Sequence, residues 1–203
     1  MEEAWGSARI ISSEFSYPWE SVSPPETVFR ALWDDSNFYF LFVAKDDDIV
    51  IAPDESSETA LDNEDRVELF FASDDIERLV QAPDSEDPTY YSIEIDPLGR
   101  VHDYAVRYYR KFDSDWDMAD LKVSSDIRDG TYVVEGKIAL KSLESLMLFQ
   151  GPAARIRIGI FRAELSHDSE QLQESWISWI SPMSEQPDFH IPSAFGRLKF
   201  VAR

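Results

Sequence analysis

The sequence predicts an all-β fold, a single antiparallel β-sandwich over residues 1–203 with one short helix. Its apolar segments are short and rich in aromatic and β-branched residues, which favour strands over helices. Turn-forming residues separate these segments, and helical spacing occurs in one place. Hydrophobic residues make up 43% of the chain, which is enough for a core, and sandwiches of about 200 residues often form one domain.

The first half of the chain contains four predicted strands. Residues 38–43 and 67–71 are near-continuous apolar runs, as expected for strands that are covered on both faces. Residues 90–95 alternate instead, and residues 101–109 follow as the partner strand. The link at 96–100 has a proline that presets φ and, two residues later, a glycine that tolerates positive φ. The two strands are therefore predicted to form a hairpin.

The second half adds four strands and the helix. Residues 131–138 follow an Asp-Gly turn, and residues 156–163 alternate, with isoleucines facing one way. Residues 140–149 carry leucine and methionine at helical spacing and predict the helix. Residues 175–180 and 195–201 complete a set of eight or nine strands.

Acidic side chains dominate the charge. The chain has 40 Asp and Glu against 19 Lys and Arg, so its net charge is −21. Phosphate binding needs a basic face, so we expect no nucleic-acid partner, and anionic membrane surfaces are disfavoured for the same reason. No apolar run approaches the roughly 20 residues of a membrane-spanning helix.

Cysteine is absent, which excludes disulfides, thiolate nucleophiles and zinc–thiolate sites. The first residues lack the basic and apolar regions of a secretory signal. Read literally, the sequence predicts a cytoplasmic protein. A leader removed ahead of Met1 would leave the same sequence on a secreted or periplasmic protein.

The sequence lacks motifs for covalent catalysis. None of its three histidines lies near a Gly-x-Ser-x-Gly elbow, and it has no phosphate-binding loop motif. A glycosidase needs two carboxylates about 5–10 Å apart across a sugar, and 40 acidic residues leave that pair unselected. A stand-alone glycan hydrolase using two carboxylates is therefore an open alternative.

Glu68 and Glu94 stand apart, because each interrupts an apolar strand segment. A carboxylate on a covered sheet face needs a hydrogen-bond donor or a cation. Two interpretations are open: these acids are paired within the structure, or they accept hydrogen bonds from a polyol. The candidate cationic contacts are Arg66, Arg107 and Arg162, for which the alternative is general neutralisation of the surrounding acids.

Tryptophans supply the aromatic candidates. Trp176 and Trp179 are three residues apart, so in a strand they face opposite sides. Trp116 lies in a strongly polar segment, where an indole either anchors the loop or forms an exposed stacking surface. Flat rings beside charged side chains suit a sugar, which combines weakly apolar C–H faces with hydroxyl rims.

Acidic clusters suggest a second kind of site. Calcium takes 6–8 oxygen ligands, many from carboxylates, and the candidate ligands for structural Ca²⁺ are Asp46, Asp47, Asp62 and Asp65. Their spacing does not match an EF-hand loop. The alternative is a charged loop that aids solubility.

Five segments, in order, resemble the family 9 carbohydrate-binding modules, in a broader set related to the DOMON group. They read ALWDDSNFYFLF at 31–42, DRVELFF at 65–71, YYSIEIDPLG at 90–99, GIFR at 159–162 and PDFHIPSAFGRL at 187–198. Each motif alone is weak, but together they span nearly the whole chain.

The resemblance implies a jelly-roll-like sandwich that binds a mono- or oligosaccharide without catalysis, with structural calcium in some members. By the resemblance, Glu68 occupies the position of an acid that contacts the sugar in the family. Some members grip the sugar between two tryptophans, the first just before the Asp-x-Val-Glu segment, where residues 59–64 contain no aromatic. Trp176 or Trp179 would supply one ring, and Trp116 would substitute for the other.

His190 lies between two prolines and is a further candidate ligand contact, with a loop-fixing hydrogen bond as the alternative. A scaffold domain with a degenerate pocket also stays open. The predicted ligand-binding residues are Trp116, Trp176, Trp179, Glu68, Glu94, Arg66, Arg107, Arg162 and His190.

Overall fold

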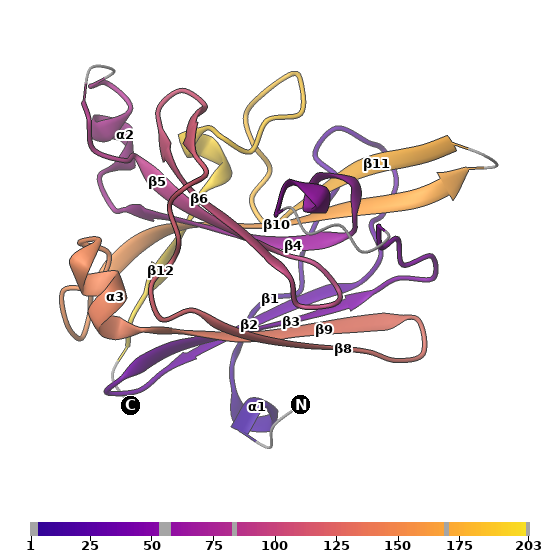
Figure 1. Ribbon diagram of the computed structural model, residues 1–203, viewed down its shortest axis with the longest axis horizontal. Helices are drawn as coiled ribbons and strands as arrows, with labels where there is room; N and C mark the ends of the chain where they lie inside the picture. The colour runs from indigo at the N-terminus through magenta and orange to yellow at the C-terminus, as the bar shows by residue number, and fades with distance from the viewer. Residues whose placement is uncertain (1–3, 53–57, 83–84, 169–170, 202–203) are drawn as a thin grey trace.

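The computed structural model, which describes residues 4–52, 58–82, 85–168 and 171–201, consists of two antiparallel sheets packed face to face (Figure 1). The smaller sheet has the order β1 (Ile10–Ser12), β2 (Thr27–Trp33), β3 (Asn37–Lys45), β9 (Thr131–Ala139), β8 (Lys122–Ile127). The larger sheet has the order β11 (Gln171–Ser178), β10 (Arg155–Asp168), β4 (Arg66–Ser73), β5 (Tyr90–Ile95), β6 (Val101–Arg107), β7 (Lys111–Asp113). Strand β12 (Gly196–Lys199) also pairs with β10. The predicted β-sandwich is confirmed.

Short helices occupy the ends and edges of the sheets. They are α1 (Ala4–Ser7), η1 (Glu58–Asn63), α2 (Ile76–Leu79), α3 (Leu140–Ser145) and η2 (Pro192–Ala194). Helix α3 begins as predicted but is shorter, because Leu146 leaves helical geometry and Met147 has a φ of 58°. None of the described helices is long and apolar enough to cross a membrane.

The main core lies between the two sheets. Phe40 and Phe42 of β3 share one buried cluster with Leu69 of β4 and Ile158 of β10. Gly136 of β9 lets the Phe40 ring approach, because a Cβ at that position would lie 2.2 Å from the ring. On the other face of β3, Trp5 and Ala8 pack against Leu41. Residues 38–43 are therefore covered on both sides, as predicted.

The outer face of the larger sheet carries a second buried cluster. Phe70, Tyr90 and Phe161 lie on this face and pack against Phe189 and Phe195, from the segment that follows β11. The rings of Phe161 and Phe189 stack with centroids 4.1 Å apart. This segment therefore covers part of the outer face and forms one wall of the site described below.

The predicted hairpin at 96–100 is confirmed. Strands β5 and β6 pair antiparallel on either side of it, and Gly99 has a φ of 80°. The Asp96 carboxylate accepts hydrogen bonds from the backbone N–H groups of Leu98 at 3.0 Å and Arg100 at 2.7 Å. The second strand ends at Arg107 rather than at residue 109.

Four described strands lie outside the predicted set, namely β1, β2, β7 and β8. Strands β7 and β8 lie at sheet edges and are mostly exposed, so neither carries an apolar pattern. In β2 the pattern is interrupted by Arg30, whose guanidinium donates hydrogen bonds to the carbonyls of Trp5 and Ala8. Exposed or interrupted patterns therefore keep these three strands from being predicted by hydrophobicity alone.

Candidate functional site

A cavity of about 100 Å³ lies over the outer face of the larger sheet. Its floor comes from β4 and β5, and its walls come from β11, the β6–β7 turn and the loops around residues 19 and 187–190. The lining residues are Trp19, Arg66, Glu68, Glu94, Arg110, Trp176, Pro187, Asp188, Phe189 and His190.

Strand register builds the floor of this pocket. Glu68 of β4 and Glu94 of β5 are direct cross-strand partners, and Arg66 lies two residues before Glu68 on the same face. The Arg66 Nε lies 3.0 Å from Glu68 Oε1 and 3.1 Å from Glu94 Oε2. All three side chains are buried, so the predicted pairing of both acids within the structure is confirmed.

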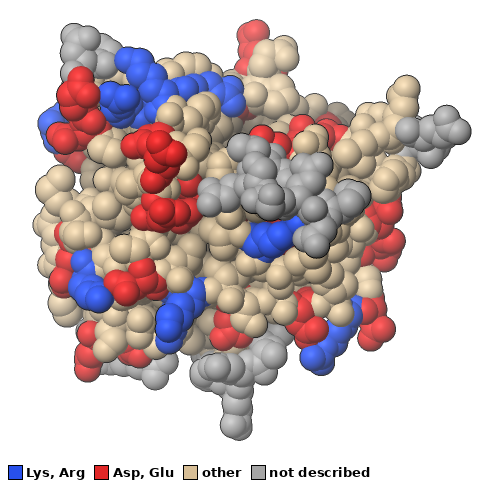
Figure 2. All heavy atoms as spheres, viewed as in Figure 1, with Lys and Arg blue, Asp and Glu red and all other residues tan. Residues whose placement is uncertain are grey.

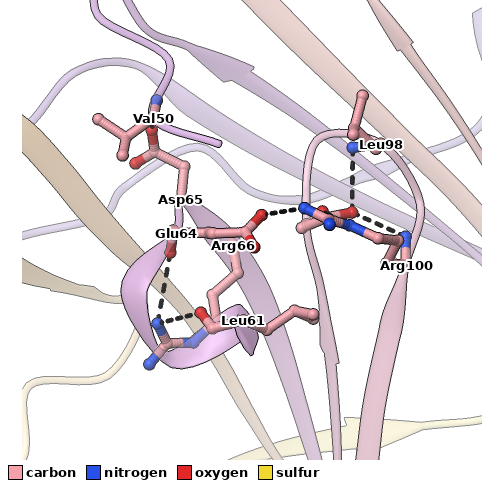
Figure 3. A network of polar contacts seen from close by, with 8 residues as sticks. Val50, Leu61, Glu64, Asp65, Arg66, Leu98 and Arg100 are labelled. Atoms are coloured by element: carbon pink, nitrogen blue, oxygen red, sulfur yellow. Dashed lines mark hydrogen bonds and ion pairs between the residues drawn. The ribbon is translucent and has the colours of Figure 1, made fainter. Parts of the chain in front are cut away.

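Helix η1 fixes the Arg66 guanidinium from one side (Figure 3). The Arg66 Nη1 donates hydrogen bonds to the carbonyl oxygen of Leu61 at 3.0 Å and to that of Glu64 at 3.4 Å. The Glu64 carboxylate in turn pairs with Arg100 of the β5–β6 hairpin. Among the described residues, the hydrogen bonds of this guanidinium engage Nε and Nη1.

The environment of the pocket floor changes the acidity of Glu68. Burial raises the pKa of Glu68 to about 8, the charge of Glu94 adds to the increase, and Arg66 opposes it. The hydroxyl of Tyr104 donates to Glu94 Oε1 at 2.5 Å. Near neutral pH Glu68 therefore holds a proton, and the pocket floor presents both donors and acceptors to the cavity.

Aromatic rings also line the pocket. The Arg66 Cζ lies 5.2 Å from the Trp176 ring centroid, a cation–π distance. The Phe189 ring lies between two indoles, 5.4 Å from Trp176 and 5.5 Å from Trp19. The Trp19 indole is fixed by a hydrogen bond from Nε1 to the carbonyl oxygen of Ser184 at 3.0 Å.

His190 and Asp188 form the remaining polar wall. The His190 Nδ1 lies 2.6 Å from the Tyr90 hydroxyl. This is the loop-fixing hydrogen bond that was the alternative to a ligand contact. Burial, with a contribution from Arg110, lowers the pKa of His190 to about 4, so the imidazole is neutral. The Tyr109 hydroxyl donates to Asp188 Oδ2 at 2.5 Å and joins the β6–β7 turn to this loop.

The pocket brings together Arg66, Glu68, Glu94, Trp176 and His190 from the predicted set. Sequence reasoning missed Trp19, Arg110, Asp188 and Phe189. Trp19 carried a usable signal, because an indole in the polar segment Pro18-Trp19-Glu20 meets the criterion that selected Trp116. Asp188 and Phe189 lie inside a segment that the resemblance had already singled out.

The structure places four other predicted residues away from the pocket. Trp116 packs on Tyr91 with ring centroids 4.8 Å apart, and Trp179 packs against the main core, where its ring covers Gly196. Arg107 forms an exposed ion pair with Glu86. Arg162 points inward from β10, on the other face of the sheet from Arg66.

Arg162 sits in a buried acidic cluster of its own. Its guanidinium pairs with Asp46 at 3.1 Å and with Glu164, and it lies over the Tyr132 ring with Cζ 5.2 Å from the centroid. The side chain has no exposed surface. Asp65 completes the cluster. Its carboxylate accepts hydrogen bonds from the backbone N–H groups of Val50 at 2.6 Å and Leu165 at 2.8 Å.

The predicted calcium ligands therefore do not form one site. Ligand atoms of Asp46, Asp65 and Glu164 lie within 4.8 Å of one another, but the Arg162 guanidinium already supplies the cation there. These residues do not fit a calcium ion, which needs six to eight oxygens free to coordinate it. Asp47 is exposed and belongs to neither described cluster of metal-type ligands, and Asp62 lies instead with Glu94 and His102.

The surface follows the acidic composition. On the face shown in Figure 2, the largest group of Lys and Arg side chains lies at the upper left corner, near α2, and smaller basic and acidic patches are scattered over the rest. The described basic side chains on this face do not form a continuous stripe, which is the arrangement that tracks a nucleic-acid backbone.

Comparisons with solved structures agree with this architecture. Two structures of a carbohydrate binding module family 9 from Caldicellulosiruptor kristjanssonii, one in complex with glucose and one with cellotriose, have TM-scores of 0.67 and 0.66 at 16% sequence identity. Both matches cover 100% of this chain, and 89% and 87% of the other chains. A structure from Bacteroides uniformis has a TM-score of 0.65 at 16% identity, over 97% of this chain and 88% of its own. At such identities the similarity shows the shared fold.

The family assignment rests on sequence. No curated protein matches the chain significantly. The family described as Carbohydrate family 9 binding domain-like matches residues 1–203, the whole chain. The protein therefore belongs to the Carbohydrate family 9 binding domain-like family.

Proposed function

We propose that this protein binds a mono- or oligosaccharide in the Arg66 pocket, without catalysis. The observation that carries the proposal is one cavity in which Arg66, Glu68 and Glu94 face the indoles of Trp176 and Trp19. Charged hydrogen-bonding groups beside flat rings are complementary to a sugar, whose hydroxyls need donors and acceptors and whose C–H faces pack on aromatic rings.

The polar floor would set specificity. A vicinal pair of hydroxyl groups can donate to Glu68 and Glu94 and accept from the Nη2 of Arg66. Hydrogen bonds to charged groups are worth about 1.5–3 kcal/mol each, and a sugar that lacks the matching hydroxyl loses one of these bonds. Specificity would therefore follow hydroxyl geometry, and Trp176 would fix the plane of the ring.

The size of the cavity suggests how a longer chain would bind. Pockets that enclose a whole drug-sized ligand measure roughly 300–1,000 Å³. The cavity here measures about 100 Å³, so it accepts part of one sugar ring and leaves the rest of an oligosaccharide outside. The related modules in complex with glucose and cellotriose support testing these two sugars first.

Hydrolysis is less well supported by the geometry. Carboxylates of glycosidases flank the scissile bond from two sides. Here Glu68 and Glu94 approach the same nitrogen of Arg66 from neighbouring strands, on one side of the cavity. The scaffold alternative assumes a pocket that has lost its aromatic rings. It is also less well supported, because Trp176 and Trp19 both line this pocket.

Calorimetric titration with glucose, cellotriose and a panel of other sugars tests the proposal. We expect saturable binding of one sugar class and a loss of about tenfold or more in affinity for Trp176→Ala, because an aromatic contact is removed. Trp116→Ala is the matched control, since the same change is made outside the pocket. Equal losses for both variants, or binding by neither wild type nor control, would contradict it. Turnover of aryl glycosides that Glu68→Gln abolishes would favour the hydrolase.

A further inference from the structure

Next to the pocket floor, three side chains of metal-ligand type converge. Asp62, Glu94 and His102 each offer a ligand atom, and these atoms lie within 4.8 Å of one another. Glu94 of β5 and His102 of β6 are cross-strand partners, so the sheet register fixes their spacing. Helix η1 lies against β6 and brings Asp62 to them.

His102 is the independent sign that a ligand belongs here. The residue is only 7% exposed, and among the described residues neither Nδ1 nor Nε2 has a hydrogen-bond partner. A neutral imidazole has one donor and one acceptor nitrogen, and burying both without partners is unfavourable. A metal ion bound to the acceptor nitrogen would satisfy the atom that faces the two carboxylates.

The carboxylates retain the capacity to coordinate. Each oxygen of an ionised carboxylate has two lone pairs. In Glu94, Oε1 uses one lone pair to accept from the Tyr104 hydroxyl at 2.5 Å, and Oε2 uses one to contact the Arg66 Nε at 3.1 Å. Each oxygen therefore keeps a second lone pair. Asp62 is exposed, so a small movement of its side chain can close the site around an ion that arrives from solvent.

We propose that Asp62, Glu94 and His102 bind one divalent transition-metal ion of the zinc class. Imidazole nitrogen with carboxylate oxygen suits zinc, whereas calcium prefers oxygen ligands alone and more of them. Three protein ligands also leave a fourth position open to water. The site shares Glu94 with the sugar pocket but rests on separate observations, so it does not depend on sugar binding.

Zinc titration of the chelator-treated protein, followed by calorimetry, tests the site. We expect one ion per chain, with affinity reduced about tenfold or more by His102→Gln and by Asp62→Asn, because each removes a ligand. Cobalt(II) in place of zinc should give visible absorption bands that His102→Gln abolishes. Asp62 is exposed, so the Asp62→Asn variant decides the question even where His102→Gln fails to fold.

The matched control is His167→Gln, because His167 is an exposed histidine beside the carboxylate of Asp48 and offers a surface alternative for zinc. We expect it to bind zinc as the wild type does. Zinc affinity that is lost in the control and kept in Asp62→Asn would overturn the proposal. So would a wild-type chain that binds no zinc at micromolar concentrations while circular dichroism shows it folded.

Discussion

Arg66 and Arg162 are buried arginines of the larger sheet, and each pairs with at least two acids. Of the two, Arg66 lines the described cavity. Arg162 on β10 faces the smaller sheet, where Asp46, Glu164 and the Tyr132 ring enclose it. Its Nη1 also donates to the Lys45 carbonyl at 2.8 Å. No part of its side chain reaches solvent.

Arg66 on β4 faces the opposite side of the same sheet. The carboxylates of Glu68 and Glu94 contact its Nε, and two backbone carbonyls accept from its Nη1. The Trp176 ring packs on the guanidinium, which also lines the cavity. The chemistry of the two clusters is the same, and the difference is what covers them. A second sheet encloses Arg162 completely, whereas loops and single rings cover Arg66 and leave space for a ligand. In the proposed function, the ion pair beneath the incomplete cover is the one that binds the sugar.

The largest expected effect comes from removing the enclosed arginine. Arg162→Met should reduce the free energy of unfolding by about 3–5 kcal/mol, because it leaves buried carboxylates without a cation. Sugar affinity, measured at a temperature where the variant is folded, should stay within about twofold of wild type. Urea unfolding measures the first quantity and calorimetry the second.

The same measurements on Arg66→Met sharpen the contrast. This variant should lose sugar affinity and retain more stability, since its carboxylates border a cavity that admits water. A variant Arg162→Met that loses sugar affinity while folded would show that the two clusters are coupled through the sheet. If Arg162→Met yields no folded protein, Arg162→Lys gives the comparison with the charge retained.

The second effect is a dependence of stability on pH. Burial raises the pKa of Glu164 to about 8, with Asp46 and Asp65 adding to the increase and Arg162 opposing it. A carboxyl whose pKa is raised by folding binds its proton more tightly in the native state. Its contribution is therefore complete below the unfolded pKa, near 4.5, and is lost as the pH rises through about 8. For Glu164 alone, the free energy of unfolding should fall by about 2 kcal/mol between pH 6.5 and 8.5.

Variants measure how much the Arg162 cluster and the pocket each contribute to the pH dependence of stability. Glu68 in the pocket has a pKa raised to about 8 and contributes with the same sign. His190, with its pKa lowered to about 4, acts in the opposite direction, but its contribution is complete above pH 6.5. Glu164→Gln and Glu68→Gln should each flatten part of the slope in urea titrations. A slope unchanged in Glu164→Gln would mean that Glu164 is ionised in the folded protein.

The fold could be predicted because most strands carry their own pattern. The isoleucines of β10 alternate regardless of what surrounds them, and the turn at Gly99 is encoded within five residues. Strands β7 and β8 could not be predicted, since an exposed edge strand is held by backbone hydrogen bonds to its neighbour, and these leave no apolar signature.

The site was predictable only where a local rule was broken. Glu68 and Glu94 could be selected because each interrupts an apolar strand. Trp19 contacts Ser184, a partner 165 residues away, and no local pattern encodes that distance. Arg66 and Arg162 looked equivalent in sequence, because which face an arginine occupies depends on strand register and on which sheet lies opposite.

The smallest effect concerns the outer wall of the pocket. The Tyr109 hydroxyl donates to Asp188 at 2.5 Å, but both residues lie at the rim, and Tyr109 is 46% exposed. Tyr109→Phe should change the free energy of unfolding by less than about 0.5 kcal/mol, because water replaces an exposed hydrogen bond at little cost. Sugar affinity should fall by no more than about threefold. A loss of more than about 1 kcal/mol in urea unfolding would show that the rim is as tightly organised as the enclosed cluster. The absence of a complete cover would then not be what separates the two arginines.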